Sequence, residues 1–117
     1  MGSPASFEVR EERGAGVHRL IPVGELDIAT VPALERAFDA VYTDDEARMI
    51  VVDLTQLSFM DSSGINLLVR MHAACKHADR LRVVNGSRAV VTVIDATGVR
   101  DVLPIISSDD DPLTTLR

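Results

Sequence analysis

Apolar and polar residues along the chain alternate with the periods of strands and helices in turn. Five segments have the pattern of strands: residues 7–10, 17–23, 49–54, 81–84 and 105–106. Gly14 and Gly16 mark a turn between the first two, which predicts a hairpin. Residues 49–54 form a short apolar run rich in β-branched side chains, which is typical of a central strand buried on both faces.

Helical spacing appears in three longer segments. After Thr30, a possible N-cap followed by Pro32, apolar residues recur on one face: Val31, Leu34, Phe38, Val41 and Tyr42. A second helix is expected from Ser62 to about Lys76, and it is apolar nearly all round. A third is expected over residues 90–96 and closed by Gly98. Asp111 and Pro112 suit the start of a brief terminal helix.

The order of these elements, β-β-α-β-α-β-α, defines the expected fold class. It predicts an α/β fold with a mixed sheet (α+β in character) of four to five strands, covered by about four helices. We expect residues 1–6 to be a flexible leader and residues 7–117 to form a single domain, since one core commonly serves about 100–150 residues.

Composition narrows the possible functions. The formal net charge of −6 argues against direct binding of nucleic acid, which needs clustered Lys and Arg. Cys75 is the only cysteine, so no intramolecular disulfide can form and a cytoplasmic location is expected. No apolar run reaches the length of a membrane span. The start, Met1-Gly2-Ser3-Pro4-Ala5-Ser6, matches the loose myristoylation pattern, but we favour an ordinary leader and expect no membrane association.

Three consecutive residues before the second helix carry the chemistry of interest. Asp61, Ser62 and Ser63 are all good N-cap types, and only one of them can be the cap. At least one serine hydroxyl is therefore expected to be free at the helix N-terminus, a favourable place for a phosphate. The plainer interpretation, that all three residues serve only to start the helix, stays open on these grounds.

The motif around these residues resembles the STAS family, in particular its bacterial anti-sigma factor antagonists. Phe59-Met60-Asp61-Ser62-Ser63-Gly64, after the strand Val51-Val52-Asp53-Leu54, is similar to the family's phosphorylation loop. Val23-Gly24-Glu25-Leu26-Asp27 and Val93-Ile94-Asp95-Ala96-Thr97-Gly98-Val99 give weaker support, and the resemblance covers nearly the whole chain.

The resemblance implies a switch. Ser62 would be the phosphoacceptor, and Asp27, Asp61, Ser63, Gly64 and Asn66 would contact the partner. That partner would be an anti-sigma factor that is also a serine/threonine kinase. The unmodified domain would bind it and release a sigma factor, and a serine phosphatase would reset the switch. No cofactor is implied, and we expect a monomer or weak dimer.

One position departs from the family pattern. The signature commonly continues Gly-Leu-Gly, whereas this chain has Gly64-Ile65-Asn66. The side chain of Asn66 would limit how closely a partner can approach the helix at this position. The departure bears on which partner binds rather than on the switch itself. A glycine at position 64 is expected to keep the helix start open to the kinase.

An enzyme is the first alternative. A nucleophile elbow requires glycine two residues before the serine, where this chain has Met60. His72 and Cys75 are spaced to share one helix face, but His72 fits a packed core histidine better than a catalytic base. We therefore expect no catalytic activity.

Two further alternatives concern other roles of similar folds. A phosphoaspartate receiver would use Asp44, Asp45 and Asp53, but it needs a lysine late in the chain, and Lys76 is the only lysine. No metal-ligand spacing is present. The remaining alternative stays within the family, whose domains also serve as accessory subunits of membrane transporters.

Overall fold

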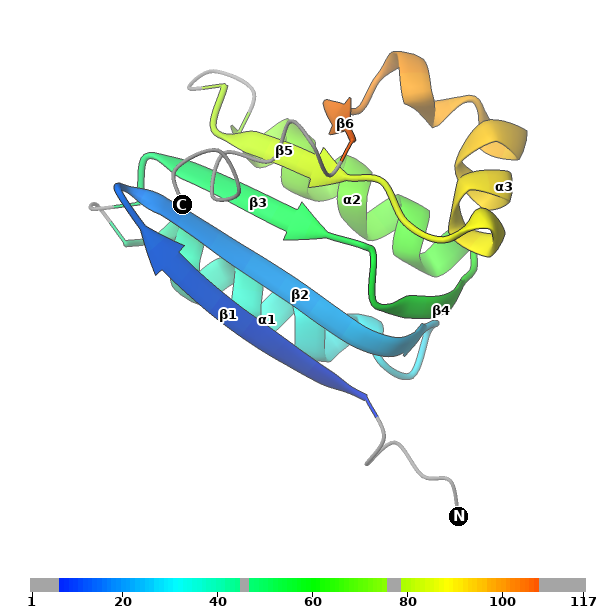
Figure 1. The fold of residues 1–117 in the computed structure, drawn as a ribbon, viewed down its shortest axis with the longest axis horizontal. Helices are drawn as coiled ribbons and strands as arrows, with labels where there is room; N and C mark the ends of the chain where they lie inside the picture. Colours follow the sequence, from blue (N-terminus) through cyan, green and yellow to red (C-terminus); the bar gives the residue numbers. More distant parts are fainter. Residues whose placement is uncertain (1–6, 45–46, 76–78, 108–117) are drawn as a thin grey trace.

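The computed structural model of the protein describes residues 7–44, 47–75 and 79–107 (Figure 1). The elements run in the order β1 (Glu8–Gly14), β2 (Val17–Leu26), α1 (Val31–Tyr42), β3 (Met49–Asp53), β4 (Leu57–Met60), α2 (Ser62–Cys75), β5 (Leu81–Val84), α3 (Arg88–Thr97), the 3-10 turn η2 (Val99–Asp101) and β6 (Ile105–Ile106). The expected α/β class is confirmed. The leader 1–6, Lys76 and the terminal helix expected at Asp111 lie outside the described residues.

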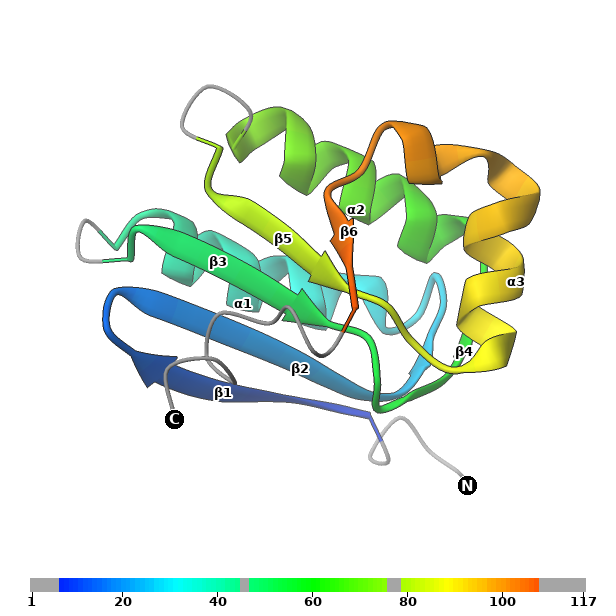
Figure 2. The ribbon, with the colours of Figure 1, turned by 45° about the horizontal axis from the view of Figure 1, so that its top comes forward.

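The six strands form one mixed sheet. Its order is β1-β2-β3-β5-β6, and β4 pairs with the end of β2 (Figures 1 and 2). The β1–β2 hairpin is antiparallel, as expected, and all other pairs are parallel. Helices α1 and α2 make the crossovers that parallel pairs require. No helix in the part of the chain described here is both long and apolar enough to cross a membrane.

The strand β2 changes partner along its length. Residues 17–20 pair with β3, and residues 24–26 pair with β4, with a shift of register between Gly24 and Glu25. Gly24 has φ +118°, a backbone conformation that side chains with a Cβ rarely adopt. The bulge at Gly24 therefore lets one strand serve two neighbours.

The strand β4 is one more than the four to five strands expected from sequence. Sequence patterning treats the segment between Leu54 and Ser62 as a link, because Leu57-Ser58-Phe59-Met60 does not alternate apolar and polar residues. In the structure only Leu57 and Met60 of these four residues are buried. Four residues with the burial order buried, exposed, exposed, buried match neither the period of a strand nor that of a helix. Pairing with β2 makes this segment a strand.

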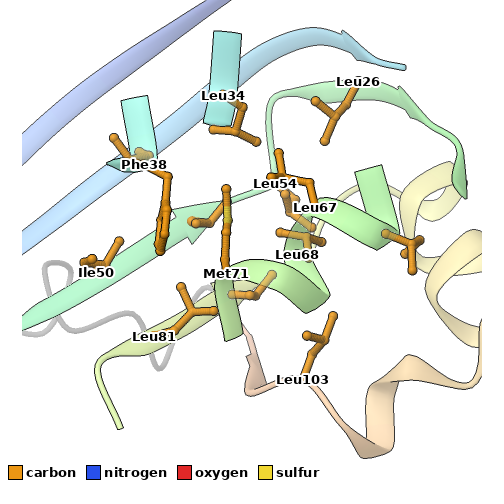
Figure 3. Packing of buried hydrophobic residues seen from close by; sticks show 14 of the residues in the cluster. Leu26, Leu34, Phe38, Ile50, Leu54, Leu67, Leu68, Met71, Leu81 and Leu103 are labelled. Atoms are coloured by element: carbon orange, nitrogen blue, oxygen red, sulfur yellow. The ribbon is translucent and has the colours of Figure 1, made fainter. Parts of the chain in front are cut away.

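The main core lies between the sheet and the helices α1 and α2. Leu34 and Phe38 of α1 meet Met71 of α2 above Ile50 and Leu81 of the sheet (Figure 3). In β3, Ile50, Val51 and Val52 are fully buried, as is Leu54 directly after the strand, which confirms a central strand buried on both faces. Burial of each such side chain contributes about 1.5–3 kcal/mol, so this core holds the ends of β2 and β4 in place.

We predict that Gly24→Ala lowers the free energy of unfolding by about 1–3 kcal/mol, because alanine is strained at this positive φ. Denaturant unfolding followed by circular dichroism measures the change. Ser58→Ala is the matched control, since it removes only the hydrogen bond from the Ser58 hydroxyl to the Gly24 carbonyl (3.2 Å). Equal, small effects of the two substitutions would contradict a conformational requirement for glycine at this bulge.

Candidate functional site

The ends of β2 and β4 bring two acidic turns side by side. Leu26 pairs with Met60, and the backbone N–H of Asp61 donates to the Leu26 carbonyl at 3.2 Å. Asp27 directly follows Leu26, and Ser62 directly follows Asp61. The parallel pairing therefore places Asp27 and the start of α2 at the same edge of the sheet, although 34 residues separate Asp27 from Asp61 in the sequence.

Asp61 is the N-cap of α2. Its Oδ1 accepts a hydrogen bond from the backbone N–H of Ser63 at 2.8 Å. Its carbonyl oxygen accepts from Gly64 at 3.1 Å and from Ile65 at 3.3 Å. The carboxylate thus satisfies one of the donors that a helix leaves unpaired at its start. Of the three candidates that the sequence leaves open, the aspartate takes the capping role.

Both serine hydroxyls are consequently released from capping. Ser62 is exposed and occupies the first position of α2, whereas Ser63 is half-buried. Within the described part of the chain, the Ser62 hydroxyl has no hydrogen-bond partner. An exposed, unbonded hydroxyl at a helix N-terminus is accessible to an enzyme that transfers phosphate, and the helix dipole favours the resulting negative charge.

Asp27 holds the turn between β2 and α1. Its Oδ1 accepts from the backbone N–H groups of Ala29 (2.9 Å) and Thr30 (3.2 Å). Thr30 precedes α1, as expected, but its side chain makes no capping hydrogen bond. The Thr30 hydroxyl instead donates to the Glu25 carbonyl at 2.7 Å, across the turn. Asp27 is therefore fixed by its own loop, with one carboxylate oxygen used in the turn.

Gly64 differs from the expectation that it keeps the helix start open to a partner. It is buried, and a Cβ there would lie 2.6 Å from Met60 Cγ and 2.9 Å from Leu26 Cδ2. A glycine at this position lets α2 pack closely on β2 and β4. Asn66 is exposed on the same helix, so its side chain is accessible to a partner.

The residues weighed for catalysis do not assemble into a nucleophile and base. Cys75 is 2% exposed, and burial raises the pKa of its thiol, an effect that the nearby Arg80 partly offsets. The thiol is therefore protonated at neutral pH and a poor nucleophile. His72 is half-buried rather than packed in the core. Of the two histidines that the structure describes, His18 is the buried one, and its Nε2 lies 2.9 Å from Glu11 Oε1.

Asp53, the central residue of the receiver alternative, has a structural role. Its Oδ2 lies 3.6 Å from Nη1 of Arg19, and its Oδ1 accepts from the backbone N–H (2.8 Å) and hydroxyl (2.6 Å) of Thr55. Both Asp53 and Arg19 are buried. Over residues 7–44, 47–75 and 79–107, no three Asp, Glu, His or Cys side chains are placed to hold a metal ion.

Comparison with known proteins shows which family the chain belongs to. Residues 6–111 match the model of the STAS domain. An anti-sigma-B factor antagonist of Staphylococcus aureus (strain NCTC 8325 / PS 47) is 34% identical over 83 residues, 70% of this chain and 76% of the relative. A crystal structure of an anti-sigma factor antagonist from Mycobacterium paratuberculosis superposes with a TM-score of 0.84 at 30% identity, covering 98% of this chain and 97% of that one.

A third similarity concerns the fold alone. The Bacillus cell fate determinant SpoIIAA, solved in its phosphorylated form, has a TM-score of 0.67 at 20% identity and covers 94% of this chain and 100% of its own. With the family model matching most of the chain, the protein belongs to the STAS domain family. Two relatives that it resembles over most of their length are anti-sigma factor antagonists.

Sequence reasoning missed the residues that position the site. Leu26 and Met60 pair β2 with β4, and Thr30 ties the Asp27 turn to the end of β2. Apolar residues on short strands carry no functional signature. One sequence signal could have indicated the pairing of β2 with β4. Leu57 and Met60 are apolar, and Met60 pairs with Leu26, the apolar residue that ends β2.

We predict that Gly64→Val lowers the free energy of unfolding by about 1–3 kcal/mol, because the added side chain overlaps Met60 and Leu26. Asn66→Val is the control. It adds the same β-branched side chain at an exposed position of α2, and it is expected to change stability by less than about 0.5 kcal/mol. Urea unfolding of both variants gives the comparison. If Gly64→Val unfolds at the same urea concentration as the parent, close packing of α2 on β2 and β4 does not require glycine at position 64.

Proposed function

We propose that this chain is an anti-sigma factor antagonist whose binding is switched by phosphorylation of Ser62. The observation that carries the proposal is the free, exposed hydroxyl of Ser62 at the first position of α2, beside the Asp61 cap. Asp27 from the turn after β2 lies at the same edge. Members of the same family that resemble this chain are themselves anti-sigma factor antagonists.

In the proposed cycle the unmodified domain binds an anti-sigma factor that is also a serine/threonine kinase. Its sigma factor is thereby released. The kinase transfers phosphate to Ser62 and dissociates, and a serine phosphatase restores the unmodified form. The chain is a substrate and a binding partner in this cycle rather than an enzyme, and it acts in the cytoplasm. A related fold, SpoIIAA, has been solved in a phosphorylated form.

Charge explains how one modification reverses binding. A phosphate adds about −1.5 to −2 charges at neutral pH. The phosphate would lie near the carboxylates of Asp61 and Asp27. In each carboxylate, only Oδ1 accepts the backbone hydrogen bonds of the turn. The added phosphate changes both the shape and the electrostatic potential of the surface that the partner contacts. Because the serine hydroxyl holds no part of the fold together, the modification breaks no internal hydrogen bond.

The proposal predicts distinct behaviour for three variants. Ser62→Ala binds the kinase with the affinity of the parent, because a small neutral side chain preserves the surface, but it accepts no phosphate. Ser62→Asp binds at least about tenfold more weakly, since it adds a third carboxylate. Ser63→Ala is still phosphorylated at position 62, because Asp61 rather than Ser63 caps the helix. Phosphate mapping by mass spectrometry and a binding titration are the measurements.

Ser62→Asn is the control for Ser62→Asp, because it has the same shape without the charge. The Asn variant is expected to bind more tightly than the Asp variant. Phosphate on Ser63 instead of Ser62 would contradict the assignment of the acceptor. Equal kinase affinity for the Ala, Asn and Asp variants would contradict the charge switch.

A further inference from the structure

Two exposed apolar side chains lie on the β2–α1 turn and on β4, the two segments that lead to the edge where Ser62 lies. Among the described residues, four large hydrophobic side chains are exposed: Ile28 (80%), Val102 (55%), Phe59 (43%) and Tyr42 (37%). Tyr42 is accounted for within the fold. Its ring stacks on Phe38 with centroids 5.6 Å apart, and its hydroxyl donates to the Ala74 carbonyl at 3.0 Å. Ile28 and Phe59 have no such internal use.

Strand pairing places Ile28 and Phe59 on adjacent segments. Phe59 pairs with Glu25 in the parallel β2–β4 register, and the next pair is Leu26 with Met60. Ile28 follows Leu26 by two residues, and Ser62 follows Met60 by the same number. The turn that carries Ile28 therefore lies next to the start of α2, and Phe59 lies on the strand that leads to Ser62.

The two segments that carry these side chains contain acidic residues and no basic ones. Residues 20–35 and 49–69, which contain both segments, include no lysine or arginine. Glu25 is exposed, and Asp27 and Asp61 are half-buried. Contiguous exposed apolar patches that are rimmed by polar residues mark sites where another protein binds. An acidic rim selects a partner surface that is basic around an apolar pocket.

We propose that Ile28 and Phe59 are the apolar anchors by which this domain binds its anti-sigma factor, whose complementary surface is an apolar pocket bordered by Arg or Lys side chains. This inference rests on the proposed function and deepens it. Large side chains that become fully buried at an interface dominate its affinity. The anchors hold the partner while Ser62 presents the hydroxyl, so affinity and phosphate transfer depend on different residues of the same surface.

The test uses Ile28→Ser and Phe59→Ser, with Val102→Ser as the matched control. Val102 is also exposed and apolar, but it lies in the connection between α3 and β6, outside both segments. Each anchor substitution is expected to weaken binding of the unmodified chain to the anti-sigma factor about tenfold or more, whereas Val102→Ser leaves it unchanged. In phosphate transfer, KM rises and kcat stays at the parent value, because Ser62 itself is intact.

The outcomes separate this inference from the proposed function. If Ser62 of the parent is phosphorylated and both anchor variants bind the anti-sigma factor as tightly as the parent, the role of Ile28 and Phe59 is wrong but the proposed function stands. Absence of any phosphate on Ser62 in the parent overturns the proposed function. Ile28→Ser leaves the fold intact because its side chain is 80% exposed, and a melting curve of each variant checks this. If sedimentation shows that the substitutions abolish only self-association, the surface binds a second copy and the inference is wrong.

Discussion

The parallel pairing of the end of β2 with β4 is the constraint on which the site depends. A strand that continued straight beside β3 would carry Asp27 away from α2. The bulge at Gly24, with φ +118°, turns the last residues of β2 toward β4, and the pair Leu26–Met60 closes the arrangement. Gly64 then allows α2 to begin directly against these two residues. The bulge at Gly24 and the absence of a side chain at Gly64 thus determine where Ser62 lies relative to the Asp27 turn.

Asp27 and Asp61 each serve two purposes at this edge. One oxygen of each carboxylate accepts backbone N–H groups, which fixes the turn after β2 and the start of α2. Each carboxylate keeps its negative charge, which contributes to the electrostatic potential of the surface that a partner would contact. Two carboxylates that are held in place near a free hydroxyl suit a switch that works by adding charge, because neither carboxylate needs to move. At an exposed site, the helix dipole would offset part of the repulsion on a phosphate at Ser62, by about 0.3–1 kcal/mol.

Much of this arrangement could be predicted from the sequence. The buried run of β3 and the helical spacing after Thr30 are strong periodic signals, and both elements occur where expected. Three N-cap residues in a row indicated a free serine at the helix start, but sequence cannot show that Asp61 is the cap. The strand β4 and the burial of Gly64 depend on contacts with β2, more than 30 residues earlier. Such long-range pairing leaves no local period, so patterning could not detect it.

In the proposed switch, charge on Ser62 changes the surface of the domain without changing its fold. Amide NMR spectra of the chain with phosphoserine incorporated at position 62, compared with the unmodified chain, test it most directly. The expected shift changes are confined to residues 24–30 and 57–66, which form the β2–β4 edge and the start of α2, and the remaining amide signals do not move. Shift changes spread through β3, β5 and α3, or lost protection of the β2–β4 amides from exchange, would contradict it.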